Sequence, residues 1–363
     1  MSGTPEGFPQ SQPMPIRPET SAPLNVGGAQ NTAGSALPGL NQPRVVNFAR
    51  IGEFCDSVES QVARVVKGQS GIVRHLLVGL LVQGHVLLEG NPGTAKTLLV
   101  RTVGRLCNLD FKRIQFTPDL MPSDITGTSI FRPDRAEFEF RKGPVFTQLL
   151  LADEINRAPA RTQAALLQAM QERTVTADGH DHTLSDIFCV IATQNPLESE
   201  GTYPLPEAEL DRFLFKLNLD YPDAKSELEI MQLHGAPKSA DELAALGAVD
   251  AFGAIDLRSM RELIYRVEVS PPVAAYALNI LRATREHAFL RAGASTRAGV
   301  MLLRAARALA ATYRRGFVIP DDVRELVVPC LHHRIFRTPA AELEAVSSDT
   351  ILEDIVGRIP APR

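Results

Sequence analysis

The sequence predicts an α/β fold in which a parallel sheet lies between helices, followed by an all-helical domain. The apolar run 86–88 leads, after one residue, into a glycine-containing turn and then a helical pattern. Two further apolar runs, 149–152 and 187–192, are each followed by polar side chains. Continuous apolar runs of this length are typical of strands buried on both faces of a sheet. From about Tyr221 the strand patterns stop and helical periodicities follow. Strands that alternate with helices are typical of a parallel sheet.

The turn after the first strand has the sequence of a phosphate-binding loop. Its backbone N–H groups and the positive end of the following helix would hold phosphate oxygens. Lys96 would add a positive charge, and the Thr97 hydroxyl would ligate Mg²⁺. The residues expected to contact the nucleotide are Gly90, Asn91, Pro92, Gly93, Thr94, Ala95, Lys96, Thr97 and Leu98. Ala95 stands where Gly is usual, so we expect a right-handed backbone there. An ordinary strand-to-helix turn is the alternative interpretation.

Length and charge narrow the class of protein. A chain of 363 residues is long enough for two packed domains with tails. The formal net charge of −4 argues against bulk attraction to nucleic acid or to anionic membranes, and no apolar run is long enough to span a bilayer. The four cysteines are widely scattered, which favours unpaired thiols and a cytoplasmic location.

Composition divides the chain into four parts. Residues 1–44 are rich in Pro, Gly, Ser, Gln and Asn and are expected to be a disordered tail. An α/β nucleotide-binding core is expected over 45–220 and a helical lid domain over 221–350, followed by a C-terminal tail over 351–363. His332 and His333 lie near the end of a lid helix, and we expect them to be satisfied surface histidines.

Two helices are predicted ahead of the phosphate loop. Apolar residues spaced three and four apart indicate an amphipathic helix over 48–66, and a largely apolar helix over 72–82. The break between them contains Gly68, which we expect to line the pocket for the adenine base. A plain turn between helices is the alternative.

Two hairpins are predicted within the core. The segment 117–127 is punctuated by Pro118, Pro122 and Gly127, so it is expected to be a loop rather than a helix. After it, 128–141 has the pattern of two strands and a polar turn, and 174–184 has Asp-Gly at its centre. We expect the first hairpin to project and contact a partner, with a capping role as the alternative.

Polar side chains end two of the predicted strands. Asp153 and Glu154 follow the run 149–152, where ligands bind in open α/β sheets. Asp153 would hold the Mg²⁺ shell, and Glu154 would act as the general base on the attacking water. Asn195, after the run 187–192, could orient that water, or it could simply cap the turn at the following proline.

Several longer motifs resemble the MoxR family of AAA+ ATPases. They are the loop 92–97 in its Pro-Gly-x-Ala-Lys-Thr form, the segment 116–127, the run 192–196 and the segment 200–213. The resemblance covers roughly residues 46–345. It implies a P-loop AAA+ core with a helical lid that binds ATP and Mg²⁺. It also implies that alanine at position 95 is usual for the family.

The resemblance also implies two functional arginines. Arg212 resembles the arginine finger, which a subunit donates to its neighbour's γ-phosphate. A surface ion pair between Asp211 and Arg212 is the alternative. Arg297, after a Ser-Thr helix cap, resembles the second sensor arginine, which reaches the γ-phosphate from the lid. Thr296 stands where the family often has proline.

These features predict an ATPase that works as a homo-oligomer, with a hexamer expected. Family resemblance suggests chaperone-like remodelling of a protein client, with a von Willebrand factor A domain partner and metal or cofactor insertion among the known variants. No nucleic acid partner is expected. The rival interpretations are a nucleic-acid motor of the same superfamily and a nucleotide-gated scaffold that needs no turnover.

Overall fold

The computed structural model describes residues 47–197, 201–234 and 254–362. The predicted disorder of residues 1–44 lies outside these ranges. The described residues belong to one compact unit. Among the helices in these ranges, none is both long enough and apolar enough to cross a bilayer.

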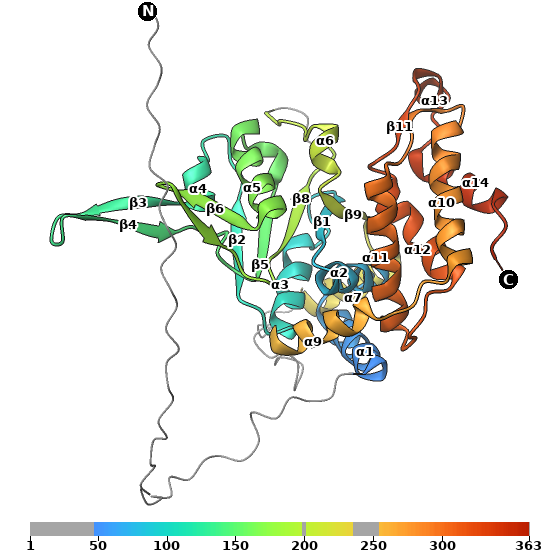
Figure 1. Cartoon of the computed structure of the whole chain (residues 1–363), viewed down its shortest axis with the longest axis horizontal. Helices are drawn as coiled ribbons and strands as arrows, with labels where there is room; N and C mark the ends of the chain where they lie inside the picture. Colours follow the sequence, from blue (N-terminus) through green and yellow to red (C-terminus); the bar gives the residue numbers. More distant parts are fainter. Residues whose placement is uncertain (1–46, 198–200, 235–253, 363) are drawn as a thin grey trace, which may run out of the picture. The chain divides into compact units, whose positions relative to one another are not determined.

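The predicted parallel sheet forms the centre of the core, and it has five strands (Figure 1). Its strands lie in the order β2-β5-β8-β1-β9. They are β1 (His85–Gly90), β2 (Phe111–Gln115), β5 (Leu149–Asp153), β8 (Cys189–Gln194) and β9 (Phe213–Leu219). Because the strands are parallel, their carboxyl ends meet at one edge of the sheet and their amino ends at the other.

Alternate residues of each strand enter two different cores. Leu149 and Leu151 pack with one cluster, whereas Leu150 and Ala152 pack with the other. This period of two places a hydrophobic layer on each face of the sheet. The continuous apolar runs in the sequence follow from burial on both faces.

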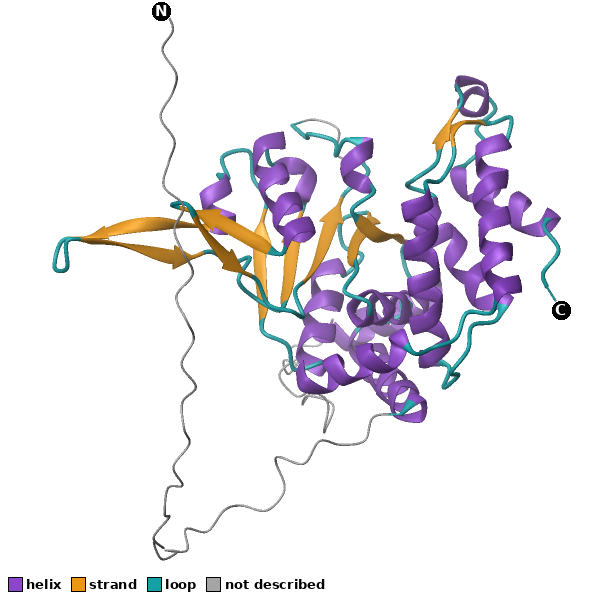
Figure 2. Ribbon diagram, viewed as in Figure 1, coloured by secondary structure: helices purple, strands orange, loops and turns teal. Residues whose placement is uncertain are grey.

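Helices cover both faces of the sheet (Figure 2). Those of the core are α1 (Phe48–Val65), α2 (Ser70–Leu81), α3 (Lys96–Leu106), α4 (Pro122–Thr126), the 3-10 turn η1 (Ile155–Arg157), α5 (Ala160–Glu172) and α6 (Glu207–Leu210). After the last strand follow α7 (Ala224–His234), α9 (Ala254–Tyr265), α10 (Pro271–Glu286), α11 (Thr296–Thr312), α12 (Pro320–Leu331), α13 (Pro339–Leu343) and α14 (Ser348–Arg358).

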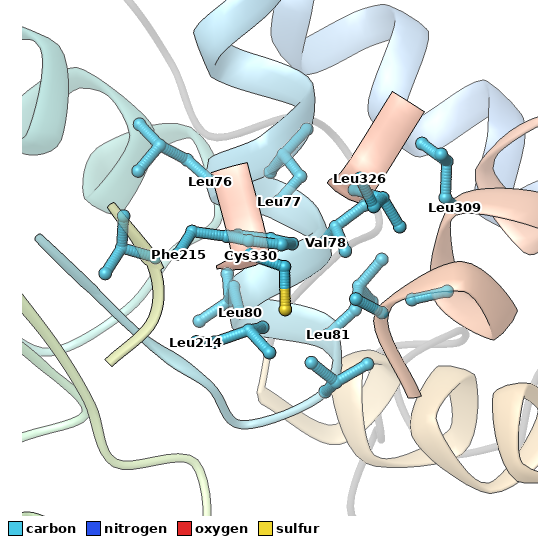
Figure 3. Close-up of a cluster of buried hydrophobic side chains, with 14 of the residues drawn as sticks. Leu76, Leu77, Val78, Leu80, Leu81, Leu214, Phe215, Leu309, Leu326 and Cys330 are labelled. Carbon is cyan, nitrogen blue, oxygen red and sulfur yellow. The ribbon is translucent and has the colours of Figure 1, made fainter. Parts of the chain in front are cut away.

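Helix α2 joins the sheet to the C-terminal helices. Figure 3 shows its leucines beside Phe215 of β9, Leu309 of α11 and Cys330 of α12, and all of these side chains belong to one buried cluster. The core and the C-terminal helices therefore share a continuous apolar interior.

Both predicted hairpins are present. The first consists of β3 (Gly127–Arg132) and β4 (Glu137–Lys142), and it extends away from the central sheet (Figure 1). The second consists of β6 (Thr174–Ala177) and β7 (His180–Thr183). The prediction that 117–127 contains no helix is wrong, because Pro122 occupies the first turn of α4, where its missing N–H costs nothing.

Two expectations about the C-terminal region need correction. The lid is helical except for a short antiparallel pair, β10 (Leu290–Ala292) with β11 (Phe336–Arg337). Residues 351–363 are not simply a tail, because α14 runs to Arg358 and buries Ile351, Leu352 and Ile355. Their spacing of one, three and four residues forms an apolar stripe on a helix only three turns long.

Candidate nucleotide site

The predicted phosphate loop and acidic pair meet at the carboxyl edge of the sheet. The loop follows β1, Asp153 ends β5, and Asn195 follows β8. These three strands are neighbours in the order β5-β8-β1, so their ends lie side by side. This edge is where open α/β sheets bind ligands.

The loop backbone is shaped by three residues. A Cβ on Gly90 would lie 2.6 Å from the carbonyl oxygen of Leu219, so only glycine fits there. Gly93 has φ +84 with open space beside it, which suits close approach of a ligand to the backbone. Ala95 has φ 60 and ψ 24, in the left-handed region. The expectation of a right-handed backbone at Ala95 is therefore wrong. The chain turns sharply from the loop into α3 at this residue. For a residue with a Cβ, the left-handed conformation costs about 1–2 kcal/mol.

Lys96 and Leu98 lie in the first turn of α3, which begins directly after Ala95. The Lys96 ammonium donates to the carbonyl oxygens of Gly90 (2.6 Å) and Asn91 (2.8 Å). Thr94 Oγ1 also donates to Asn91 O, at 2.8 Å. The positive charge is thus held at the mouth of the loop, next to the N-terminus of the helix.

Thr97 and Asp153 provide a set of oxygen atoms suited to Mg²⁺. Thr97 Oγ1 donates to Asp153 Oδ2 at 3.1 Å, and Thr193 Oγ1 donates to Asp153 Oδ1 at 2.5 Å. Asp153 is buried, with 8% of its side chain exposed. Hydroxyl and carboxylate oxygens are the hard ligands that Mg²⁺ prefers, so these residues fit the ion.

Arg113 on β2 is a neighbour of the site that the sequence analysis missed. Its Nε and Nη2 atoms donate to Asp153 Oδ2 at 3.0 and 2.7 Å, the same oxygen that faces Thr97. Local sequence patterns give no sign that this residue pairs with the acidic strand, because Asp153 lies 40 residues later in the chain.

Glu154 leaves the sheet in a left-handed conformation, with φ 57. Its N–H donates to Thr193 Oγ1 at 2.9 Å. Its carboxylate accepts from Gln115 Nε2 at 2.6 Å and pairs with Arg157 at 3.2 Å. The side chain is 33% exposed, so it lies beside the loop with access to solvent.

Asn195 directly follows β8, as predicted, and it is buried there. Its Oδ1 accepts from the N–H of Leu197 at 3.2 Å. This is the turn-capping contact that the sequence analysis gave as the alternative to a role in hydrolysis.

The break between α1 and α2 lines a hollow of about 460 Å³. Gly68 has φ +76, and Gln69 donates to the carbonyl oxygen of Asp220 at 2.8 Å, which ties the break to the end of β9. His332 and Asp349 close the hollow from the lid side. Its position is the one that the sequence analysis assigned to the adenine base through Gly68.

The two arginines lie at the opposite edge of the sheet. Arg212 directly precedes β9, whose first residue pairs with His85 at the start of β1. Arg297 lies in the first turn of α11, 3.7 Å from Asp211. Since β1 rises about 3.3 Å per residue, about 17 Å of strand separates this edge from the phosphate loop.

Arg212 and Arg297 line one hollow of about 170 Å³, together with Arg173 and Arg304. Arg212 pairs with Glu209 at 2.7 Å and donates to the carbonyl oxygen of Leu167 at 2.8 Å. The predicted alternative, a pair between Asp211 and Arg212, is wrong, because Asp211 instead pairs with Arg297 and Arg334. The structure does not bring either arginine to the phosphate loop of its own chain.

Comparisons with known proteins agree with this architecture. Residues 85–215 match the family described as "ATPase family associated with various cellular activities (AAA)", and residues 282–355 match an AAA lid domain. The chain is 40% identical over 354 residues to Chaperone MoxR1 of Mycobacterium tuberculosis, covering 94% of this chain and 92% of that protein. The chain is a MoxR-family AAA+ ATPase.

Two further relatives match over most of their length. Protein MoxR of Paracoccus denitrificans is 34% identical over 307 residues, covering 78% of this chain and 89% of that protein. A crystal structure of a protein from Cytophaga hutchinsonii superposes with a TM-score of 0.79 at 40% identity, covering 87% of this chain and 97% of the other. The MoxR fold, nucleotide binding by the AAA domain and ATPase activity follow from these relatives.

Proposed function

We propose that this MoxR ATPase hydrolyses ATP at sites shared between subunits of a homo-oligomeric ring, a hexamer. The observation that carries the proposal is the separation of the two halves of the site. Lys96, Thr97, Asp153 and Glu154 meet at the carboxyl edge of the sheet, whereas Arg212 and Arg297 lie at the amino edge. A closed ring of identical subunits would bring one edge against the other edge of a neighbour.

Within the carboxyl edge, each side chain has a distinct task. The loop N–H groups and Lys96 bind and orient the β- and γ-phosphates of ATP. Thr97 and Asp153 hold Mg²⁺, which neutralises phosphate charge when bound. Glu154 accepts a proton from the attacking water, and Asn195 orients that water after leaving its contact with Leu197.

The arginines would act from the neighbouring subunit. A guanidinium supplied in trans stabilises negative charge that develops on the transferring phosphoryl group. Arg212 is the arginine finger in this proposal, and Arg297 is a second arginine donated beside it. This revises the expectation for Arg297, because the lid carries it next to Arg212 rather than to the loop of its own chain.

The β3–β4 hairpin is the proposed contact with a protein client. Phe131 and Phe138 lie 5.3 Å apart between ring centroids and are 50% and 73% exposed. Exposed aromatic pairs at the end of a projecting hairpin are suited to binding apolar segments of another protein. Resemblance to the family also suggests a von Willebrand factor A domain partner and metal or cofactor insertion. We further propose a cytoplasmic location, which the four buried free thiols support.

Steady-state ATP hydrolysis as a function of protein concentration tests the shared site. Specific activity should rise with concentration as subunits assemble, and the Glu154→Gln variant should bind ATP and assemble but not hydrolyse. Activity independent of concentration would refute sharing. Stimulation by DNA or RNA at low salt would favour the nucleic-acid motor, and a Glu154→Gln protein that still performs the biological role would favour the scaffold.

A further inference from the structure

The end of α12 lies along the open edge of the sheet. Strand β9 is an edge strand, paired only with β1 among the strands that the structure describes. His332 Nε2 lies 3.0 Å from the carbonyl oxygen of Lys216, and His333 Nε2 lies 3.1 Å from that of Phe213. Both histidines are therefore held against β9, and the expectation that they are surface residues is wrong.

Arg334 continues this contact and is the most buried charge in it. Only 2% of its side chain is exposed. Its Nη1 donates to the carbonyl oxygens of Leu214 (3.1 Å) and Cys330, and its Nη2 donates to those of Asp211 (3.1 Å) and Phe213. A buried guanidinium is tolerated only when its donors are satisfied, so these acceptors fix its position.

The remaining donor of Arg334 binds the residue that precedes the proposed arginine finger. Arg334 Nε donates to Asp211 Oδ1 at 2.8 Å. The other carboxylate oxygen of Asp211 lies 3.7 Å from Arg297 Nε. One carboxylate thus joins a buried, fully hydrogen-bonded arginine to an arginine whose side chain is 51% exposed.

Geometry matters for Arg212 and Arg297, whose side chains are 23% and 51% exposed, because both must meet a partner outside their own chain. A long side chain held in one orientation binds an anion with less loss of conformational entropy. Arg334 holds both the backbone of Asp211 and its carboxylate, and Arg212 is the next residue. Arg334 therefore fixes both the backbone next to Arg212 and the carboxylate that pairs with Arg297.

We propose that Arg334 is a positioning residue for ATP hydrolysis, acting through Asp211 to place Arg212 and Arg297 for donation to the neighbouring subunit. The proposal rests on the shared site put forward above. Arg334 itself is buried among backbone carbonyl groups and the Asp211 carboxylate. Its effect is exerted on the neighbour's site and not on the site of its own subunit.

Two variants test this role, Arg334→Lys and Asp211→Asn. Lysine keeps the charge but cannot reproduce the planar set of donors. Asparagine is similar in shape but lacks the charge that holds Arg297. Each should lower kcat about 10- to 100-fold while the affinity of its own phosphate loop for ATP stays within about threefold. Arg337→Lys is the matched control, because Arg337 lies three residues on and its Nη1 donates to the carbonyl oxygen of Val346 (3.0 Å). It should keep wild-type activity.

Mixing subunits separates positioning from a general loss of structure. Each variant is mixed with Lys96→Ala, whose own loop is disabled but whose arginines are intact. Hydrolysis should rise above that of either protein alone, because the variant's phosphate loop can use the arginines of a Lys96→Ala neighbour. The reference is a mixture of Arg212→Ala with Lys96→Ala.

Three results would overturn the proposal. If both variants keep wild-type kcat, Arg334 does not position the arginines. If neither mixture regains activity while the reference mixture does, Arg334 acts on folding or on its own site, and the shared site stands without it. If the reference mixture is also inactive, the shared site fails and the inference fails with it.

Discussion

The two edges of the central sheet are organised differently. At the carboxyl edge the catalytic candidates contact one another, with Thr97 on Asp153 and Gln115 on Glu154. At the amino edge Arg212 pairs with Glu209 three residues before it, and Arg297 of the lid lies 3.7 Å from Asp211 of the core. The residues at the carboxyl edge thus contact one another within a single chain. The arginines at the amino edge lie far from the phosphate loop of the same chain. The difference supports the proposal that hydrolysis uses a site shared between two copies of the chain.

Removal of Arg212 should give the largest effect. In Arg212→Ala, kcat should fall about 1,000-fold, because a trans arginine stabilises the charge of the transition state. The affinity for ATP should change little, since the phosphate loop of the variant is intact. Steady-state kinetics and calorimetric titration measure the two quantities. Arg324→Ala, on the exposed face of α12, is the control and should be indistinguishable from wild type. A large loss of ATP affinity in Arg212→Ala would place this arginine at its own loop.

Protonation of His85, at the amino edge of the sheet, should lower the free energy of unfolding. Burial, helped by the positive charge of nearby Arg173, lowers the pKa of His85 from 6.5 to about 4, although the hydrogen bond to Met170 O acts in the opposite direction. Neutral His85 accepts from the N–H of Val190 at 3.0 Å. Because the unfolded state binds the proton first, stability is full above pH 6.5 and is lost as the pH falls toward 4. The loss from this group is about 3 kcal/mol in the free energy of unfolding.

Denaturant unfolding at several pH values tests the role of His85. The variant His85→Gln should show a shallower decline between pH 6.5 and 4 than wild type. His180→Gln, on the exposed strand β7, should decline as wild type does. Parallel declines in wild type and His85→Gln would assign the acid sensitivity to other groups.

A smaller effect is expected from Arg113 at the carboxyl edge. Arg113 donates two hydrogen bonds to Asp153 Oδ2, the oxygen expected to face Mg²⁺. Removing this cation in Arg113→Gln should lower the Mg²⁺ concentration for half-maximal ATPase about two- to fivefold, because the two cations compete for one oxygen. An increase in the Mg²⁺ requirement would mean that Arg113 supports the metal site instead.

The smallest effect concerns the backbone at Ala95. Ala95→Gly should raise the free energy of unfolding by about 0.5–1 kcal/mol, since glycine adopts φ 60 without strain. Ala164→Gly, in the interior of α5, should lower it by about 1 kcal/mol. Urea denaturation of both variants measures the contrast. A destabilised Ala95→Gly protein would contradict the strain assigned to this position.

The sequence predicted the carboxyl edge far better than the amino edge. The phosphate loop and the pair Asp153 and Glu154 are contiguous motifs next to apolar strands, so their chemistry can be read locally. Arg334 could not be found this way, because its contact with Asp211 joins residues 123 positions apart. The left-handed conformation of Ala95 was also missed. Alanine usually prefers a right-handed backbone, and the sequence does not show that the turn into α3 requires a positive φ. The helix α14 was missed because its apolar stripe is only three turns long.

The most direct test of the shared site is ATP hydrolysis by Arg212→Ala and Lys96→Ala proteins mixed over a range of mole fractions. Each protein alone should have at most about one thousandth of wild-type activity. Equal amounts should restore up to about a quarter of wild-type activity, because half of the sites keep Lys96 and half of those have a neighbour with Arg212. Activity should fall toward zero on either side of equality. A flat line at zero across all mole fractions, with both proteins folded and assembled, would contradict the account.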